Sequence, residues 1–184
     1  MSGPAQIVIL GEDAAHVGSL YRAMVDHFGI PSGKVRKLPV GNGRGDAKRH
    51  VLRQVPGQIA LLRRGPRSAA LVIAVDGDGA DETRRIREVS DALRADGMNA
   101  INADDRVVIV VPCRNAETWL RFVQCTTVDE ETNYKQGRRS MWTRQDFELV
   151  GRALGQVQPP KANPPPSLDN ARARLRETFA ERVQ

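Results

Sequence analysis

The sequence predicts an α/β fold, with a parallel sheet of about four strands, helices on both of its faces and a proline-linked C-terminal helix. Three short apolar runs, 7–10, 71–75 and 107–111, have the length and composition of buried central strands. Segments with apolar residues at helical spacing separate these runs, as a parallel sheet requires. The chain has 184 residues, which is enough to bury one core of this kind.

The first half of the chain is predicted to form strand, helix, short strand and basic helix. Gly29 and Pro31 end the first helix, because glycine accepts the backbone angles of a helix end and proline cannot continue a helix. The basic helix is expected to end before Pro56 for the same reason. These four elements are predicted at 7–10, 14–28, 35–40 and 47–55.

The second half continues the alternation and then becomes irregular. Proline pairs and triplets after residue 158 predict a stiff, extended connector, and Ser167 and Asp169 are predicted caps of the last helix. The outer face of the helix at 81–96 is expected to be rich in arginine. The remaining elements are strands at 71–75 and 107–111, helices at 81–96, 116–124, 146–154 and 170–183, and a polar loop at 126–137. We expect the chain to divide into a main domain at 5–125, an extension of helix and loop at 126–158, and a proline-rich linker with the C-terminal helix at 159–184.

The composition excludes several classes of protein. No apolar stretch approaches the roughly 20 residues that span a bilayer, so we expect no membrane segment. The N-terminus has no basic region followed by a long apolar run, and we expect no secretory signal. The two cysteines, Cys113 and Cys125, form neither a disulfide framework nor a metal cluster. Reduced thiols and a cytoplasmic location are therefore expected.

Charge is distributed unevenly along the chain, whose net charge is +6. Residues 34–67 contain ten Lys or Arg and one acid, whereas residues 68–133 contain seven basic and thirteen acidic residues. Residues 134–184 are basic again, with ten basic and five acidic residues. Basic surfaces that hold a polyanion beside an acidic pocket would give this pattern. Charge also varies along soluble chains that bind no polyanion, and this alternative stays open.

Acidic residues follow each of the three apolar runs. Glu12 follows the first run, Asp76-Gly77-Asp78 the second and Glu117 the last. Ligands of open α/β sheets bind outside the carboxyl ends of the strands, so these acids are predicted to share one site. Mg²⁺ commonly takes one or two protein carboxylates and keeps several waters. Acids at such positions also cap turns and helices, and the residues alone leave that alternative open.

In this order the acids resemble the Toprim family, the catalytic domain shared by topoisomerases, bacterial primases and overcoming-lysogenisation-defect (OLD) nucleases. The Gly-Glu at 11–12 resembles its first motif, and the Asp-Gly-Asp at 76–78 resembles its Asp-x-Asp motif. The span between them is long enough for a helix, a strand and a second helix. Residues 112–119 are similar to a segment of small stand-alone Toprim-like proteins near the OLD nucleases. The resemblance covers roughly residues 5–125.

The resemblance implies a Toprim-like (Rossmann-like) fold, Mg²⁺ or Mn²⁺, and phosphodiester chemistry on DNA or RNA. It implies that Glu12 is a general acid/base or metal ligand, and that Asp76 and Asp78 are metal ligands. Glu117 would complete a second metal position. Two alternatives for that position are Asp81 and Glu82.

Departures from the family narrow the expected activity. Tyr21 and Tyr134 lack the context of a strand-transfer tyrosine, and the sequence has no zinc ribbon and no Walker A motif. Topoisomerase and ATPase activities are therefore not expected, and nuclease activity remains. The likeness to OLD nucleases implies an ATPase partner on another chain and, by analogy alone, a role in phage defence. A homo-oligomer is a further alternative.

Basic residues around a glycine-rich loop at 41–45 are predicted to bind nucleic acid. Glycines let backbone N–H groups approach a phosphate, and a helix start adds a favourable dipole. A mobile loop and a solvated helix face explain the same residues equally, and Arg114 could instead pair with Glu117. The residues predicted to hold the nucleic-acid backbone are Arg44, Lys48, Arg49, Arg53 and Arg114.

Other residue types are predicted to be structural. His16 and His50 are expected on helix surfaces, and Trp119 and Trp142 are expected to pack rather than to stack on bases. Two other functions remain open. One is a non-catalytic interaction module that binds a protein or nucleic acid. The other is a phosphoryl-accepting domain of flavodoxin-like fold, for which no supporting Lys late in the sheet can be placed.

Overall fold

The computed structural model describes residues 6–40, 46–79, 81–124, 127–134, 142–158, 161 and 163–179. Its centre is one sheet of four parallel strands in the order β2-β1-β3-β4. The predicted α/β fold with a parallel sheet is therefore confirmed. The strands are β1 (Ile7–Gly11), β2 (Val35–Lys37), β3 (Ala70–Ala74) and β4 (Val107–Val110).

Helices connect the strands and extend the chain beyond β4. A π-helical turn, η1 (Ala23–His27), continues α1, and a 3₁₀ turn, η2 (Ser32–Lys34), precedes β2. No helix within the described ranges combines the length and apolarity that crossing a membrane requires. The α-helices are α1 (Ala14–Arg22), α2 (Ala47–Arg64), α3 (Glu82–Ala95), α4 (Ala116–Val123), α5 (Arg144–Gly155) and α6 (Pro166–Phe179).

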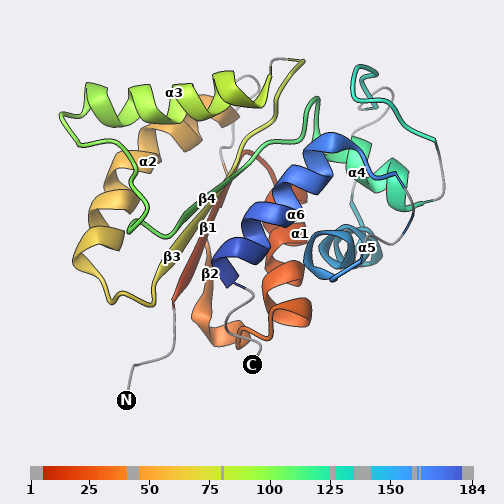
Figure 1. Ribbon diagram of the computed structural model, residues 1–184, viewed down its shortest axis with the longest axis horizontal. Coiled ribbons are helices and arrows are strands. Elements are labelled where there is room, and N and C mark those ends of the chain that lie inside the picture. The colour runs from red at the N-terminus through yellow and green to blue at the C-terminus, as the bar shows by residue number, and fades with distance from the viewer. Residues whose placement is uncertain are drawn as a thin grey trace.

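The helices form a layer on each face of the sheet. Figure 1 shows α2 and α3 on one side of the strands and α1, α4, α5 and α6 on the other. Alternate strand residues point to opposite sides, so Val72 packs in the core under α1, α5 and α6, and Ile73 in the core under α2 and α3. Helix α1 leads outward to β2 and α3 leads outward to β4. The connection from β1 to β2 and the connection from β3 to β4 therefore run toward opposite edges of the sheet. Because such connections are right-handed, α1 and α3 lie on opposite faces.

Helix α2 continues beyond the point at which the sequence predicted its end. It passes through Pro56 and ends at Arg64, so the predicted end before Pro56 is wrong. Proline inside a helix costs roughly 3 kcal/mol. Val51, Val55 and Ile59 are spaced four residues apart and are fully buried on one face. Burial of each such side chain contributes about 1.5–3 kcal/mol, which outweighs the cost of the proline.

The last two helices begin earlier than predicted. Thr143 and Asp146 form a capping box that starts α5 at Arg144, ahead of the predicted start at 146. Helix α6 starts at Pro166, whose fixed backbone angle suits a first helical position. Ser167 and Asp169 therefore lie inside its first turn, and their predicted role as caps is wrong. The predicted end at 183 lies outside the described residues.

Helices α5 and α6 share the core of the sheet. Leu154 of α5 and Phe179 of α6 are fully buried in the same cluster as Phe28 and Trp119. The predicted packing role of Trp119 is thus confirmed, and Trp142 packs on Phe147 with ring centroids 5.6 Å apart.

Polar contacts fix α6 beside β4, at one edge of the sheet. Arg174 donates to the Ile109 carbonyl at 3.0 Å and pairs with Glu82 of α3 at 2.7 Å. At the other end of the strand, Arg106 donates to the Thr178 carbonyl at 2.6 Å. The C-terminal helix is therefore docked on its own sheet.

Candidate functional site

The strand order places two predicted acids at the topological switch point of the sheet. The chain leaves β1 toward one edge and leaves β3 toward the other, and crevices of this kind bind ligands in open α/β sheets. Glu12 directly follows β1, and its N–H donates to the Ala74 carbonyl at 3.2 Å. Asp76 follows two residues after the end of β3. The structure therefore brings Glu12 and Asp76 together, as predicted from the sequence.

Charged, buried side chains contact the polar groups of Asp76 on three sides. Its N–H donates to Glu12 Oε1 at 3.1 Å. Its carbonyl accepts from Arg85 Nε at 3.0 Å, and its Oδ1 lies 3.0 Å from His16 Nε2. Asp76 is only 2% exposed. A side chain and backbone held in this way have one orientation, which is what a preorganised site needs.

His16 is buried, and the prediction that it lies on the helix surface is wrong. Its Nδ1 lies 2.8 Å from Asp13 Oδ1, and the same carboxylate caps α1 by accepting from the His16 N–H. Burial alone would lower the pKa of His16, but Asp13 and Asp76 beside the ring raise it well above 6.5. The two carboxylates that flank His16 therefore favour its protonated form. Its spacing of four from Leu20 was the sequence signal that placed it on the inner face.

Glu12 has an unusual protonation equilibrium. Burial is the largest cause that raises the pKa of its carboxyl group, and the nearby charges of Asp76 and Asp78 act in the same direction, so that the pKa rises from 4.5 to about 7. His16 and the N–H of Asp76 oppose this shift. The cations present therefore do not offset the crowding of negative charge at Glu12. A group with a pKa close to neutrality can both take and give a proton at physiological pH.

Asp78 lies on a tight turn next to Asp76. Gly77 approaches the segment after β4 so closely that a Cβ atom there would collide with the Cys113 carbonyl. Asp78 itself has a φ of +53°, a left-handed conformation that Asp tolerates better than most residues. Its exposed carboxylate lies 3.3 Å from Arg85 and 3.5 Å from Lys48. Asp78 is thus at the open side of the site and Asp76 at its floor.

Arg85 is the second residue at the candidate site that the sequence did not predict. It was expected on the arginine-rich outer face of its helix, but it is 4% exposed and points toward the 76–78 turn. Its spacing of four and eight from Val89 and Leu93 places it on the apolar face, and this signal was present in the sequence.

The other predicted acids have local partners. Glu117 begins α4 and is buried, with Trp142 Nε1 3.5 Å from its Oε1. Asp81 caps α3 by accepting from the Arg84 N–H at 2.6 Å. Glu82 binds α6 through Arg174 and Asn170. A role for Glu117 at a second metal position stays a prediction.

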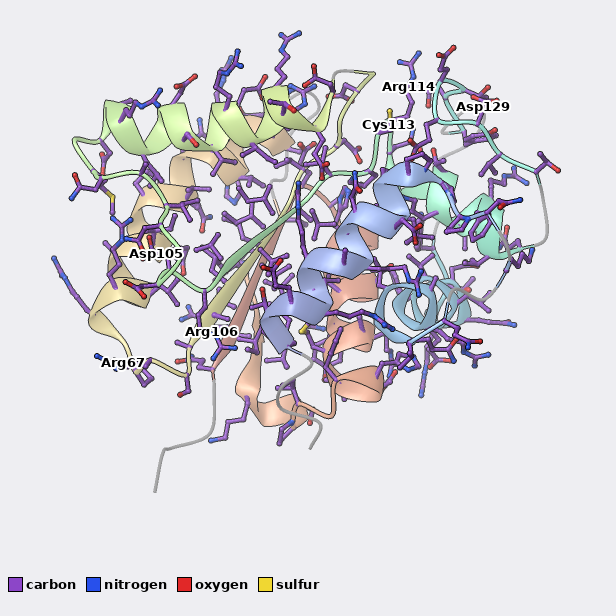
Figure 2. The ribbon with its side chains drawn as sticks, viewed as in Figure 1. Arg67, Asp105, Arg106, Cys113, Arg114 and Asp129 are labelled. Carbon is purple, nitrogen blue, oxygen red and sulfur yellow. The ribbon has the colours of Figure 1, made fainter. Side chains whose placement is uncertain are left out.

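The predicted nucleic-acid-binding residues occupy two positions near the site. Lys48, in the first turn of α2, reaches Asp78, whereas Arg49 and Arg53 both pair with Asp46. Arg114 follows β4, at the same end of the sheet, and donates to the Glu131 carbonyl at 2.7 Å. Figure 2 shows Arg114 and Cys113 at the end of the molecule opposite Arg67 and Arg106. Arg44 lies outside the described residues.

We tested whether these residues suit a divalent cation. Within the described ranges, no three His, Cys, Asp or Glu side chains are grouped as a metal site. Mg²⁺ needs fewer protein ligands, because it takes one or two carboxylates together with waters and substrate phosphates. Glu12 and Asp76 supply two carboxylates, with Asp78 beside them. Their carboxylate oxygens are the hard ligands that these ions prefer, so the donor set fits Mg²⁺ or Mn²⁺ in this mode.

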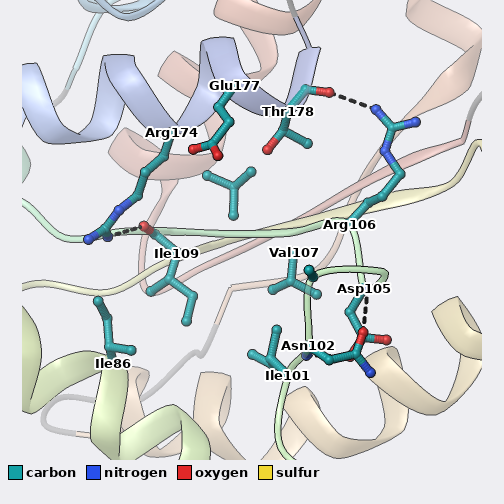
Figure 3. Close-up of a pocket in the computed structure, with 12 residues that line it drawn as sticks. Ile86, Ile101, Asn102, Asp105, Arg106, Val107, Ile109, Arg174, Glu177 and Thr178 are labelled. Carbon is teal, nitrogen blue, oxygen red and sulfur yellow. Dashed lines mark hydrogen bonds between the residues drawn. The ribbon is translucent and has the colours of Figure 1, made fainter.

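A separate cavity lies away from these residues. It has a volume of about 620 Å³ and opens along the edge of β4, between α3 and α6. In Figure 3, Arg106 and Arg174 reach across it to Thr178 and Ile109, so its arginines are already bonded. The candidate site is therefore identified by its charges and by its place in the sheet, since the volume of the cavity points to a different region.

Comparison with known proteins gives no relative. No protein-family model, no curated protein and no solved structure matches this chain.

Proposed function

We propose that this protein is a Mg²⁺- or Mn²⁺-dependent phosphodiester hydrolase acting on DNA or RNA. The observation that carries the proposal is the pair of Glu12 and Asp76 at the switch point, with the pKa of Glu12 raised to about 7 by burial and like charge. The Toprim resemblance of residues 11–12 and 76–78 supports the same chemistry. Their position at the carboxyl ends of adjacent parallel strands is where such a site is expected.

The residues of this site have separate roles in the proposed reaction. When bound, the metal would supply Lewis-acid stabilisation of charge on the phosphate oxygens. Asp76 would hold it from the floor of the site and Asp78 from the open side. Glu12 is placed either to hold the metal or to move a proton at its Oε atoms, for which a pKa of about 7 is suitable. His16 keeps one oxygen of Asp76 in place.

Basic residues near Asp78 support a polyanionic substrate. Lys48 is only half-buried beside Asp78, and α2 presents Arg49 and Arg53 farther along the same helix. Such side chains contact phosphates without reading the sequence of bases. Arg114 provides a second cation at the same end of the sheet. Glu117 is the least supported member of the proposed catalytic set.

Three further parts of the proposal rest on resemblance or composition. An ATPase partner on another chain follows from the likeness to OLD nucleases, as does a role in phage defence. Self-association of this chain is an alternative to that partner. A cytoplasmic location follows from the sparse cysteines.

A second candidate function is a non-catalytic interaction module. It is favoured by the cations that already contact the acids, because His16 lies against Asp76 while Arg85 and Lys48 lie against Asp78. In this alternative the charges stabilise the turn, and the basic helix α2 binds a protein or nucleic acid.

Metal titration with thermal unfolding distinguishes the two functions. A ligand that binds only the folded state at 100 times its Kd stabilises it by about 2.7 kcal/mol. We expect millimolar Mn²⁺ or Mg²⁺ to raise the Tm of the wild type and to support cleavage of plasmid DNA or of an RNA oligonucleotide. The isosteric change Asp76→Asn should remove both effects, and Asp105→Asn, far from the site, should keep them. Absence of both effects in the wild type would favour the interaction module.

A further inference from the structure

Arg85 makes a concentrated set of contacts with the turn that carries the candidate acids. Its Nε donates to the carbonyls of Asp76 and Gly77, at 3.0 and 3.1 Å. Its Nη2 donates to the Gly77 carbonyl at 2.6 Å and to Asp78 Oδ2 at 3.3 Å. Glu88, one turn along α3, binds Nη1 with both carboxylate oxygens, at 2.7 and 2.9 Å. One guanidinium therefore connects α3 to three consecutive residues.

These contacts satisfy the polar groups of the turn in the conformation that it adopts. The carbonyls of Asp76 and Gly77 both accept from Arg85 in a buried region, where an unpaired carbonyl would cost about 1–3 kcal/mol. The next residue, Asp78, has a φ of +53°. A left-handed residue of this kind persists when its surroundings determine it. Arg85 acts from one side of the turn, and the Cys113 carbonyl closes against Gly77 from the other.

We infer that Arg85 is a positioning residue of the candidate site, which sets where the carboxylates of Asp76 and Asp78 stand. Its effect on catalysis rests on the proposed function, whereas its effect on the turn does not. The planar guanidinium is required because its fork reaches two carbonyls and two carboxylates at once, and the single ammonium of lysine cannot. In this role Arg85 acts through Asp76 and Asp78.

The chain contains a matched control for this role. Arg172 of α6 is also a buried arginine, at 6% exposure against 4% for Arg85. It pairs with an acid three residues earlier, Asp169, at 2.9 Å. Its Nη2 donates to the carbonyls of two consecutive residues, Gln156 and Val157. The two arginines have similar surroundings, but Arg172 holds a loop after α5 and not the candidate site.

The test compares Arg85→Lys with Arg172→Lys in the full chain. Four quantities are measured, namely the Tm, the Mn²⁺ affinity without substrate by calorimetry, and the kcat and KM for nucleic-acid cleavage. We expect both variants to lower the Tm, because each loses buried hydrogen bonds. Only Arg85→Lys should weaken Mn²⁺ binding, by about 10- to 100-fold, which is the usual effect of losing a residue that orients metal ligands. It should lower kcat and leave KM for nucleic acid nearly unchanged.

Two results would overturn the inference. One is a folded Arg85→Lys protein that binds Mn²⁺ as tightly as the wild type. The other is an equal loss of Mn²⁺ affinity in Arg172→Lys, which would indicate a general effect of destabilisation.

A wild type that neither binds Mn²⁺ nor cleaves nucleic acid would refute the proposed function and not the role of Arg85. Amide hydrogen exchange then decides that role. The N–H groups of Gly77 and Asp78 donate to the carbonyls of Pro112 and Arg114. Arg85→Lys should speed their exchange relative to Arg172→Lys, and unchanged exchange would refute the positioning role.

Discussion

Glu12 and Asp105 are carboxylates near opposite ends of the sheet, and their surroundings shift their pKa values in opposite directions. Glu12, after β1, is buried beside Asp76 and Asp78, and its pKa rises to about 7. Asp105, before β4, accepts two hydrogen bonds from Arg63, at 2.9 and 2.7 Å, and these lower its pKa below 3.8. One region therefore concentrates negative charge, whereas the other neutralises it.

This difference indicates that the region around Glu12, and not the region around Asp105, is suited to bind a cation or to transfer a proton. A carboxylate that already has a guanidinium partner gains little from a ligand, even beside a cavity of about 620 Å³. A carboxylate crowded by like charges is unstable in its ionised form, so a cation or a proton binds to it readily. Strong pKa shifts caused by burial and neighbouring charge are typical of functional sites.

The largest expected effect is on cleavage activity, which should depend on the region around Glu12 and not on the region around Asp105. Asp76→Asn combined with Asp78→Asn should reduce metal-dependent cleavage by roughly 10³-fold or more, because both proposed metal ligands are lost. Asp105→Asn should leave cleavage unchanged. The measurement is the rate of plasmid or oligonucleotide cleavage at saturating Mn²⁺. Wild-type rates in the double variant would remove the site from the proposal.

The next effect concerns the backbone of the site. Gly77→Ala should destabilise the fold by about 3 kcal/mol, because its Cβ collides with the rigid Cys113 carbonyl. Gly57→Ala is the control, since a Cβ there meets no atom within 4 Å and alanine favours the helix by about 0.5–1 kcal/mol. Chemical denaturation measures both. Equal stability of the two variants would contradict the close approach at Gly77.

The pH dependence of stability should have opposite signs in the two regions. Between pH 4.5 and 7 the unfolded chain ionises Glu12 and the folded chain does not, so this group should lower stability by about 3 kcal/mol as pH rises. His16 acts in the same direction above pH 6.5, because its folded pKa is raised. Asp105 contributes stability above pH 3.8 that is lost as pH falls through its lowered pKa.

Two variants isolate these contributions in denaturation curves taken from pH 3 to 8. Glu12→Gln should flatten the decline between pH 4.5 and 7, and Asp105→Asn should remove part of the loss at acidic pH. If Glu12→Gln keeps the full decline, Glu12 does not have the raised pKa.

The smallest effect concerns the exposed cation of the site. The pair of Lys48 and Asp78 is largely solvated, so Lys48→Gln should change stability by less than about 1 kcal/mol. It should reduce the salt dependence of nucleic-acid binding by about one phosphate contact. Arg67→Gln, at the opposite end of the molecule, should not. Fluorescence anisotropy at several salt concentrations tests both, and equal slopes would place the nucleic acid elsewhere.

The sequence predicted the strands well because apolar, β-branched runs have few alternatives to burial in a sheet. The strand predicted at 71–75 is β3 at 70–74, and every residue of it is buried. It also predicted that Glu12 and Asp76 would meet, because strand ends in a parallel sheet share one edge.

The features that the sequence did not predict depend on contacts made in the folded structure. A histidine or an arginine on a helix is expected at the surface, unless buried acids or carbonyls are known to receive it. His16 is buried because Asp13 and Asp76 flank it, and Arg85 because two strand-end carbonyls point at it. Asp13 and Asp76 lie far apart in the sequence, and the two carbonyls near Arg85 accept from it only because of the way the 76–78 turn folds. The continuation of α2 through Pro56 was missed for a similar reason. The helix is stabilised beyond Pro56 because its apolar face is buried against the sheet.

The hydrogen bond from Arg174 to the Ile109 carbonyl also bears on how the edge of the sheet meets other chains. Strand β4 borders the sheet, and an uncovered border strand is a template on which other chains can add. Arg174 occupies one of its outward acceptors, and α6 lies alongside. Without α6, the same strand would present bare backbone and adjacent apolar surface to every other copy. We therefore expect the C-terminal helix to reduce edge-to-edge association of the chain.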